Sequence, residues 1–179
     1  GVPNVRSDRS QQEYCRMLTS QLHALDPTRL VSANDGWEQV EQTDLCAIHD
    51  YSLAPESCDA YEDWDAVTKT QMRPRLVFAD GNSWRGQPVM ITEFGGIAFE
   101  TGEEDDSWGY NERAKSDREF CDRLAPVVRY LSRDERFAGF CYTQLTDVMQ
   151  ETNGLLTPER EPKLPIDALR AIFCPEKQK

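Results

Sequence analysis

The sequence has few of the features that attach a chain to a membrane or to a nucleic acid. No apolar run approaches the roughly 20 residues that span a bilayer, and no basic stretch followed by an apolar one marks a signal peptide. Basic side chains are outnumbered, because 20 lysines and arginines stand against 32 aspartates and glutamates, a formal net charge of −12. Nucleic acids and anionic lipids are bound through basic patches, so we expect neither as a partner.

Cysteine and histidine are also scarce. Six cysteines among 179 residues are too few for a disulfide scaffold. None of them forms a CxxC pair and there are two histidines, so we expect no structural zinc site. Most of the cysteines fall in apolar segments, where a free thiol behaves as a small buried residue. We therefore expect reduced thiols in the core, and such thiols slightly favour a cytoplasmic location. We also expect no cofactor.

Helical and extended apolar segments alternate along the chain and predict an α/β fold with a parallel sheet. Apolar residues at the i, i+3, i+4 spacing of an amphipathic helix occupy residues 10–25. Further helices are predicted over residues 61–70, 120–131 and 166–173. Pro126 should kink or divide the helix over 120–131. Short strands are predicted over residues 30–33, 45–48, 88–92 and 137–145.

Four strand–helix units are too few for a complete (β/α)₈ barrel, which takes about 250 residues. Two architectures fit this count, a small open α/β sheet and the second half of a barrel. In both, the polar residues that follow the strands lie where α/β proteins place their chemistry.

The polar residues after two of these strands are the first candidates for chemistry. Glu93 follows five strand residues and precedes Gly95 and Gly96, which let the backbone turn sharply. Its carboxylate could have a catalytic role or could cap the turn that follows. The spacing of the residues does not favour one of these roles over the other. His49 and Tyr51 follow another strand, and alternation places both on one face. In that position they would bind a polar ligand. The alternative is that the His49 imidazole makes its hydrogen bonds inside the fold and has no ligand.

Three tryptophans, Trp37, Trp84 and Trp108, lie in loops that follow strands. An exposed indole stacks well on the apolar face of a sugar ring. The alternative for each is that it anchors its own loop. An α/β serine hydrolase is not expected, because no G-x-S-x-G segment is present.

Taken together, the motifs resemble glycoside hydrolase family 2, which includes β-galactosidases, β-glucuronidases and β-mannosidases. The segment ITEFGG at 91–96, with HDY at 49–51 before it, resembles the part of the catalytic barrel that carries the nucleophile. GFCYTQLTD at 139–147 resembles the strand that closes the barrel. NGLLT at 153–157 resembles the end of the barrel in β-galactosidase-like members.

This resemblance implies a retaining β-glycosidase built on a (β/α)₈ barrel. Residues 1–179 would be one partial domain, the C-terminal half with strands 5 to 8, and Glu93 would be the nucleophile. No ligand set for a metal is seen. The other residues expected around the sugar are Asn34, Asp35, Trp37, His49, Tyr51, Trp108 and Thr143, the last in place of the family's usual tryptophan.

The family's acid/base glutamate lies in an Asn-Glu segment after strand 4, and none of these residues matches that place in the barrel, since the Asn111-Glu112 pair follows the segment that carries Glu93. We therefore expect the 179 residues alone to be nearly inactive, because general acid catalysis is worth about 10²–10⁴-fold. Open barrel edges should also make them self-associate. The second interpretation is a non-catalytic carbohydrate-binding or scaffold domain. Galactose, glucuronic acid and mannose all stay open as the sugar.

Overall fold

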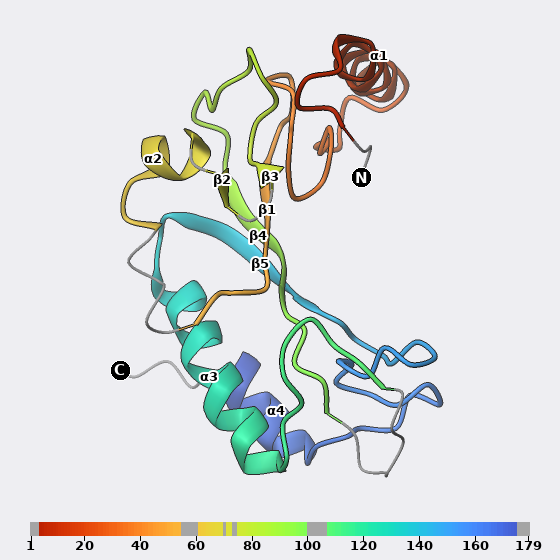
Figure 1. Ribbon diagram of the computed structural model, residues 1–179, viewed down its shortest axis with the longest axis vertical. Coiled ribbons are helices and arrows are strands. Elements are labelled where there is room, and N and C mark those ends of the chain that lie inside the picture. The colour runs from red at the N-terminus through yellow and green to blue at the C-terminus, as the bar shows by residue number, and fades with distance from the viewer. Residues whose placement is uncertain (1–3, 55–60, 70, 73–74, 100–106, 175–179) are drawn as a thin grey trace. The chain divides into compact units, whose positions relative to one another are not determined.

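The computed structural model describes residues 4–54, 61–69, 71–72, 75–99 and 107–174 of the chain. The helices are α1 (Arg9–Leu25), α2 (Trp64–Lys69), α3 (Asp117–Arg133) and α4 (Ile166–Phe173). The strands are β1 (Cys46–Asp50), β2 (Gln71–Met72), β3 (Arg75–Leu76), β4 (Val89–Gly95) and β5 (Phe137–Thr143) (Figure 1).

The predicted α/β class with a parallel sheet is confirmed. Strands β1, β4 and β5 form the sheet, in the order β1-β4-β5. A separate antiparallel pair joins β2 to β3. None of the described helices has the length and apolar character needed to cross a membrane.

The prediction of a strand over residues 30–33 is wrong. The backbone N–H of Val31 donates to the carboxylate of Asp44 at 2.7 Å. The N–H of Ala33 donates to the hydroxyl of Thr43 at 3.1 Å. Because side chains of the next loop take up these donors, the segment needs no neighbouring strand to satisfy its backbone.

The helices lie close to where the periodicity predicts them. Helix α4 has the predicted bounds, and α2 is shorter than predicted because Asp63 caps the N–H groups of Asp65 and Ala66. Of the two outcomes predicted for Pro126, a kink or a division of the helix, the division does not occur, since α3 runs through Pro126 for 17 residues. One apolar side of α3 is buried along its length, and this packing outweighs the single hydrogen bond that proline removes.

The chain divides into two compact units. Unit 1 consists of Gly1–Asp50, Asp59–Thr92 and Arg136–Phe140, and unit 2 of Tyr51–Cys58, Glu93–Glu135 and Cys141–Lys179. Strand β1 thus lies in unit 1, and helices α3 and α4 lie in unit 2, where they pack on each other. Strand β4 passes from one unit to the other between Thr92 and Glu93.

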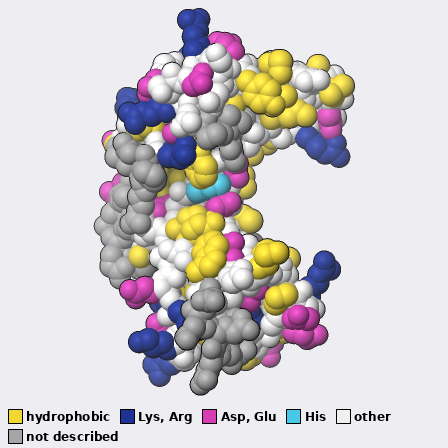
Figure 2. All heavy atoms as spheres, turned by 45° about the vertical axis from the view of Figure 1, so that its right-hand side comes forward, with side chains coloured by type: hydrophobic (Ala, Val, Ile, Leu, Met, Phe, Trp, Pro, Cys, Tyr) yellow, Lys and Arg dark blue, Asp and Glu magenta, His cyan; other side chains and the backbone are white. Residues whose placement is uncertain are grey.

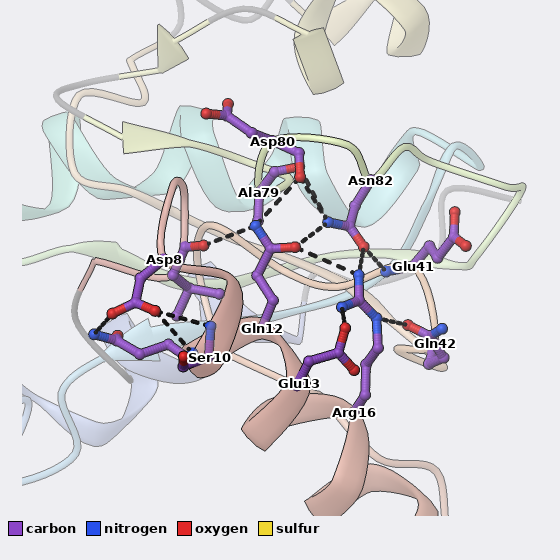
Figure 3. A network of polar contacts seen from close by, with 12 residues as sticks. Asp8, Ser10, Gln12, Glu13, Arg16, Glu41, Gln42, Ala79, Asp80 and Asn82 are labelled. Carbon is purple, nitrogen blue, oxygen red and sulfur yellow. Dashed lines mark hydrogen bonds and ion pairs between the residues drawn. The ribbon is translucent and has the colours of Figure 1, made fainter.

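A polar network holds α1 within unit 1 (Figure 3). The helix begins at the N-cap Asp8, whose carboxylate accepts the N–H groups of Ser10 and Gln11. The side-chain amide of Gln12 donates to three backbone carbonyls at 3.1–3.2 Å. Arg16 donates to the Asn82 side-chain oxygen at 2.7 Å. Hydrogen bonds rather than apolar contacts therefore dominate this side of the helix.

The apolar face of α1 is uncovered instead. Tyr14, Met17, Leu22 and Leu25 are 50%, 53%, 49% and 75% exposed. The buried residues of the helix are Gln12, Cys15 and Thr19, which lie on another side. Figure 2 shows hydrophobic side chains on the surface at the height that α1 occupies in Figure 1.

The expectation of core thiols is confirmed for two cysteines and wrong for two. Cys15 and Cys46 are free and buried, and burial raises the pKa of Cys46 to about 12. Cys141, in β5, and Cys174, the C-cap of α4, are free and exposed. Cys121 is partly buried, and the sixth cysteine, Cys58, lies outside the described residues.

Candidate functional site

Glu93 and Tyr51 meet in unit 2. Glu93 lies in β4 and Tyr51 directly follows β1. The Tyr51 hydroxyl donates a hydrogen bond to Oε2 of Glu93. Burial raises the pKa of Tyr51 well above its ordinary value, and the Glu93 carboxylate raises it further. The phenol therefore keeps its proton and can hold an ionised carboxylate in one orientation.

Two glycines make this arrangement possible, as the sequence predicts. Gly95 and Gly96 have φ angles of +88° and +57°, which favour glycine. A Cβ on Gly95 would lie 2.3 Å from the ring of Tyr142. A Cβ on Gly96 would lie 2.8 Å from the ring of Tyr51. The glycines therefore supply both the turn and the space for aromatic rings next to Glu93.

The segment 108–111 packs against Tyr51. The ring of Tyr110 is stacked on that of Tyr51, with centroids 3.9 Å apart and planes 14° apart. The side-chain amide of Asn111 donates to the carbonyls of Tyr51 and Gly95, each at 2.6 Å. Trp108 is half exposed, and its ring meets Tyr110 edge-on at 5.6 Å.

Thr143 ends β5 beside the same pair. Its side chain hydrogen-bonds to Tyr51, and its carbonyl accepts the N–H of Gly96 at 3.1 Å. These contacts place Thr143 among the supports of the Tyr51 hydroxyl. A direct contact with a sugar, for Thr143 as for Trp108, stays a prediction.

A second polar group lies in unit 1. The carboxylate of Asp35 accepts the Thr92 hydroxyl at 2.9 Å and pairs with Nε2 of His49 at 3.2 Å. Burial alone would raise the pKa of Asp35, but these two hydrogen bonds outweigh it and hold the pKa below its ordinary value. The Asp35 side chain is 48% exposed and that of His49 only 10%, so the carboxylate orients the imidazole from the solvent side.

The turn before β1 is shaped around His49. Trp37 meets the imidazole edge-on at 4.9 Å. Gly36 has a φ angle of +86°, and a Cβ there would lie 2.3 Å from the imidazole. The Asn34 amide is buried and donates to the carbonyl of Trp37 at 2.8 Å. Asn34 therefore braces this turn, and Asp35 is the residue of the turn that reaches solvent.

Trp84, the third tryptophan considered as a sugar contact, has a structural role. The indole N–H of Trp84 donates to the carbonyl of Gln87 at 2.9 Å, so this tryptophan anchors its own loop.

A cavity of about 270 Å³ in unit 2 lies between Tyr51, Asn111 and the α3 residues Asp122 and Arg123. Glu93 is not among its lining residues, so this cavity is separate from the carboxylate. In the described part of the chain, no cluster of three or more His, Cys, Asp or Glu side chains could hold a metal ion.

Solved structures resemble this chain, although no family model and no curated protein matches its sequence. A GH2 β-galacturonidase from Eisenbergiella tayi is 15% identical with a TM-score of 0.62, over 94% of this chain and 31% of its own. A β-glucuronidase from Bifidobacterium dentium is 22% identical with a TM-score of 0.61, over 97% and 29%. A β-glucuronidase from Faecalibacterium prausnitzii is 18% identical with a TM-score of 0.61, over 96% and 30%.

Over these residues the chain shares their fold. The resemblance to glycoside hydrolases that the motifs indicate is thus supported at the level of fold. The chain spans 29–31% of the length of the three solved structures. Their names describe uronidases, and the β-galactosidase-like character expected from residues 153–157 stays a prediction.

Three residues of the site are not singled out by the sequence. Thr92 donates to Asp35, Tyr110 stacks on Tyr51, and Asn111 joins the ends of two strands. Thr92 lies beside Glu93 in the motif, so the strand that presents Glu93 also signals Thr92. The contacts of Tyr110 and Asn111 depend on where a long loop returns, and no local spacing signals that.

Proposed function

We propose that this chain is the second half of the catalytic barrel of a retaining β-glycosidase, with Glu93 as the nucleophile. The observation that carries the proposal is the Tyr51–Glu93 pair at the ends of β1 and β4, in a chain with the fold of glycoside hydrolases. A carboxylate that attacks carbon has to be ionised and aimed. The neutral Tyr51 phenol serves both needs, because it stabilises the charge through a hydrogen bond and fixes one oxygen.

The reaction has two steps. The free oxygen of Glu93 attacks the anomeric carbon, the bond from that carbon to the leaving oxygen breaks, and a general acid protonates that oxygen. Water then attacks the anomeric carbon of the glycosyl ester, giving up a proton to the same group, now acting as a base. The sugar leaves with its original β configuration, and Glu93 is again a carboxylate beside Tyr51.

The general acid is proposed to lie outside these 179 residues. A retaining pair of carboxyl groups stands about 5–5.5 Å apart, and the family resemblance puts the second glutamate after strand 4. The uncovered apolar face of α1 supports this proposal, because an apolar helix face is normally packed against further residues. We propose that the first half of the barrel covers this face in the full gene product.

The proposed sugar is neutral, a β-galactoside rather than a uronide. A sugar carboxylate is bound through charge-assisted hydrogen bonds from Lys or Arg. Lys163, on the loop after β5, donates to both oxygens of Asp147 at 2.9 Å, and its side chain is 2% exposed. Its ammonium group is therefore used inside the protein and not offered to a ligand.

The test uses the full gene product that contains these residues. It is assayed on nitrophenyl β-galactoside, β-glucuronide, β-galacturonide and β-mannoside, beside Glu93→Gln and the exposed control Glu112→Gln. We expect one sugar, the galactoside, to be hydrolysed by the wild type and the control, and activity to fall to background in Glu93→Gln.

Azide identifies the role of Glu93. In Glu93→Ala, azide can take the place of the carboxylate at the anomeric carbon and should restore turnover, with an α-glycosyl azide as product. A β-glycosyl azide would instead make Glu93 the acid/base group. No turnover of any sugar by the folded wild type would favour the second interpretation, a carbohydrate-binding or scaffold domain.

A further inference from the structure

We infer that Tyr110 is a positioning residue for the nucleophile: its ring, stacked on Tyr51, holds the Tyr51 hydroxyl on the Glu93 carboxylate. The catalytic consequence of this inference rests on the proposed function. The contact itself does not, since all three residues belong to unit 2. Tyr110 would act through Tyr51 and touch neither Glu93 nor the sugar in the reaction.

The stack restricts how Tyr51 can move. Ring centroids 3.9 Å apart with planes 14° apart describe a face-to-face contact over most of the ring. Tyr110 is itself about half exposed, so it stands between the Tyr51 ring and solvent. Without it, the Tyr51 ring would gain both water contact and freedom to rotate away from Glu93.

Tyr110 is well anchored for this role. The backbone N–H of Asn111 donates to the carbonyl of Gly96 at 2.9 Å. The side chain of Asn111 adds the two bonds of 2.6 Å to the carbonyls of Tyr51 and Gly95. On the other side, the backbone of Trp108 pairs with Gln150 and Thr152 at 2.8 and 2.9 Å. Tyr110 is thus held between two neighbours that are bonded to the frame of the site.

The close fit depends on Gly96. A Cβ there would lie 2.7 Å from Cβ of Tyr110 and 2.8 Å from Cδ1 of Tyr51, so both tyrosines pack directly on the glycine backbone. The turn after Glu93 and the stack of the two rings therefore form one packed arrangement. A loop that merely covered the site would not need this contact.

The stacked ring of Tyr110 carries the larger part of the proposed role, and a hydrogen bond between the Tyr110 and Tyr51 side chains adds to it. Burial raises the pKa of Tyr110, and the Glu151 carboxylate raises it further, so the phenol is neutral and adds no charge near Glu93. Tyr110→Phe loses the hydrogen bond to Tyr51 but keeps the stacked face, so it should preserve most of the function. Tyr110→Leu removes the face and should lose it.

The first measurement is independent of turnover. Tyrosine labelled with ¹³C at Cζ is incorporated into the full gene product, and the Tyr51 signal is assigned from its loss in Tyr51→Phe. In the wild type and in Tyr110→Phe, this signal should shift when Glu93→Gln removes the carboxylate that accepts the Tyr51 hydroxyl. In Tyr110→Leu the shift should fall by at least half. An undiminished shift in Tyr110→Leu would overturn the inference.

The second measurement is kinetic, on the sugar that the wild type hydrolyses. Misplacement of a catalytic group by about 1 Å can cost about 10²-fold in rate. We expect kcat to fall by about 10- to 100-fold in Tyr110→Leu with KM nearly unchanged, Tyr110→Phe to stay close to the wild type, and the exposed control Glu159→Gln to resemble it. A higher KM with unchanged kcat would make Tyr110 a sugar contact and overturn the inference. If no sugar is hydrolysed, the proposed function fails, while the Tyr51 signal still decides whether Tyr110 positions Tyr51.

Discussion

Asp35 is held in place by hydrogen bonds although half of its side chain faces solvent. Its two oxygens accept from Thr92 and pair with His49. Both contacts stabilise the ionised form, and together they outweigh the partial burial, so the pKa lies below its ordinary value of 3.8. The same contacts that orient His49 therefore make the stability of the protein depend on pH.

Asp35→Asn should reduce stability at neutral pH but have less effect in acid. A carboxylate with a depressed pKa stabilises the folded state above its ordinary pKa, and this contribution is lost as the pH falls through the depressed value. Because Asp35 is half exposed, we expect a loss below about 1 kcal/mol at pH 7. The difference should shrink below pH 3.8.

The measurement is urea denaturation of wild type and variant at several pH values between 7 and 2. Glu159→Gln, at an exposed position, is the control. A difference between Asp35→Asn and wild type that stays constant over this range would contradict the prediction.

The loop after β5 is braced by a buried ion pair. Asp147 and Lys163 have side chains 7% and 2% exposed, and Lys163 also donates to the carbonyl of Thr152 at 2.8 Å. Asp147 accepts the N–H of Gly154 at 2.7 Å as well. A Cβ on Gly154 would lie 2.4 Å from the backbone of Asp147, which shows how closely the two sides of the loop pack.

Removing one partner of this pair should cost more than removing both. Lys163→Met leaves the Asp147 carboxylate buried without its cation, and such changes cost about 3–5 kcal/mol. The double variant Asp147→Leu, Lys163→Met leaves no buried charge and should be more stable than Lys163→Met alone. The free energies of unfolding in urea decide this. If the double variant is less stable than both the wild type and Lys163→Met, the pair is needed for more than mutual neutralisation.

At the scale of the whole molecule, the main feature is the uncovered apolar face of α1. Four large apolar side chains on one helix face are about half exposed or more. Contiguous apolar surface of this kind marks a contact with other protein. In the full gene product we propose that the rest of the barrel supplies it.

The 179-residue chain alone should therefore self-associate through this face. Met17→Lys with Leu22→Lys places two like charges on the face and should make the chain monomeric. Ser20→Lys adds charge on a different side of the same helix and should leave the association unchanged. Light scattering over a wide concentration range measures the mass of each. A monomeric wild type at every concentration, or equal loss of association in Ser20→Lys, would contradict the prediction.

The local parts of this structure follow from the sequence. The bounds of α4 and the buried side of α3 follow from the spacing of apolar residues, because side chains three and four residues apart lie on the same face of any α-helix. Gly95 and Gly96 mark the turn after Glu93 because few other residues accept a positive φ. The same turn predicts that the Glu93 side chain lies at the edge of the sheet.

Only the tertiary structure decided the contacts between distant segments. Residues 30–33 have the composition of a strand, yet Asp44 and Thr43 take their hydrogen bonds. The apolar face of α1 looks like a core face, yet the helix buries Gln12, Cys15 and Thr19 instead. Tyr110 reaches Tyr51 across 59 residues of sequence, by a loop whose path is set by Asn111. Local geometry repeats with the chain, whereas these contacts depend on where each loop returns, and that is determined by the packing of the whole unit.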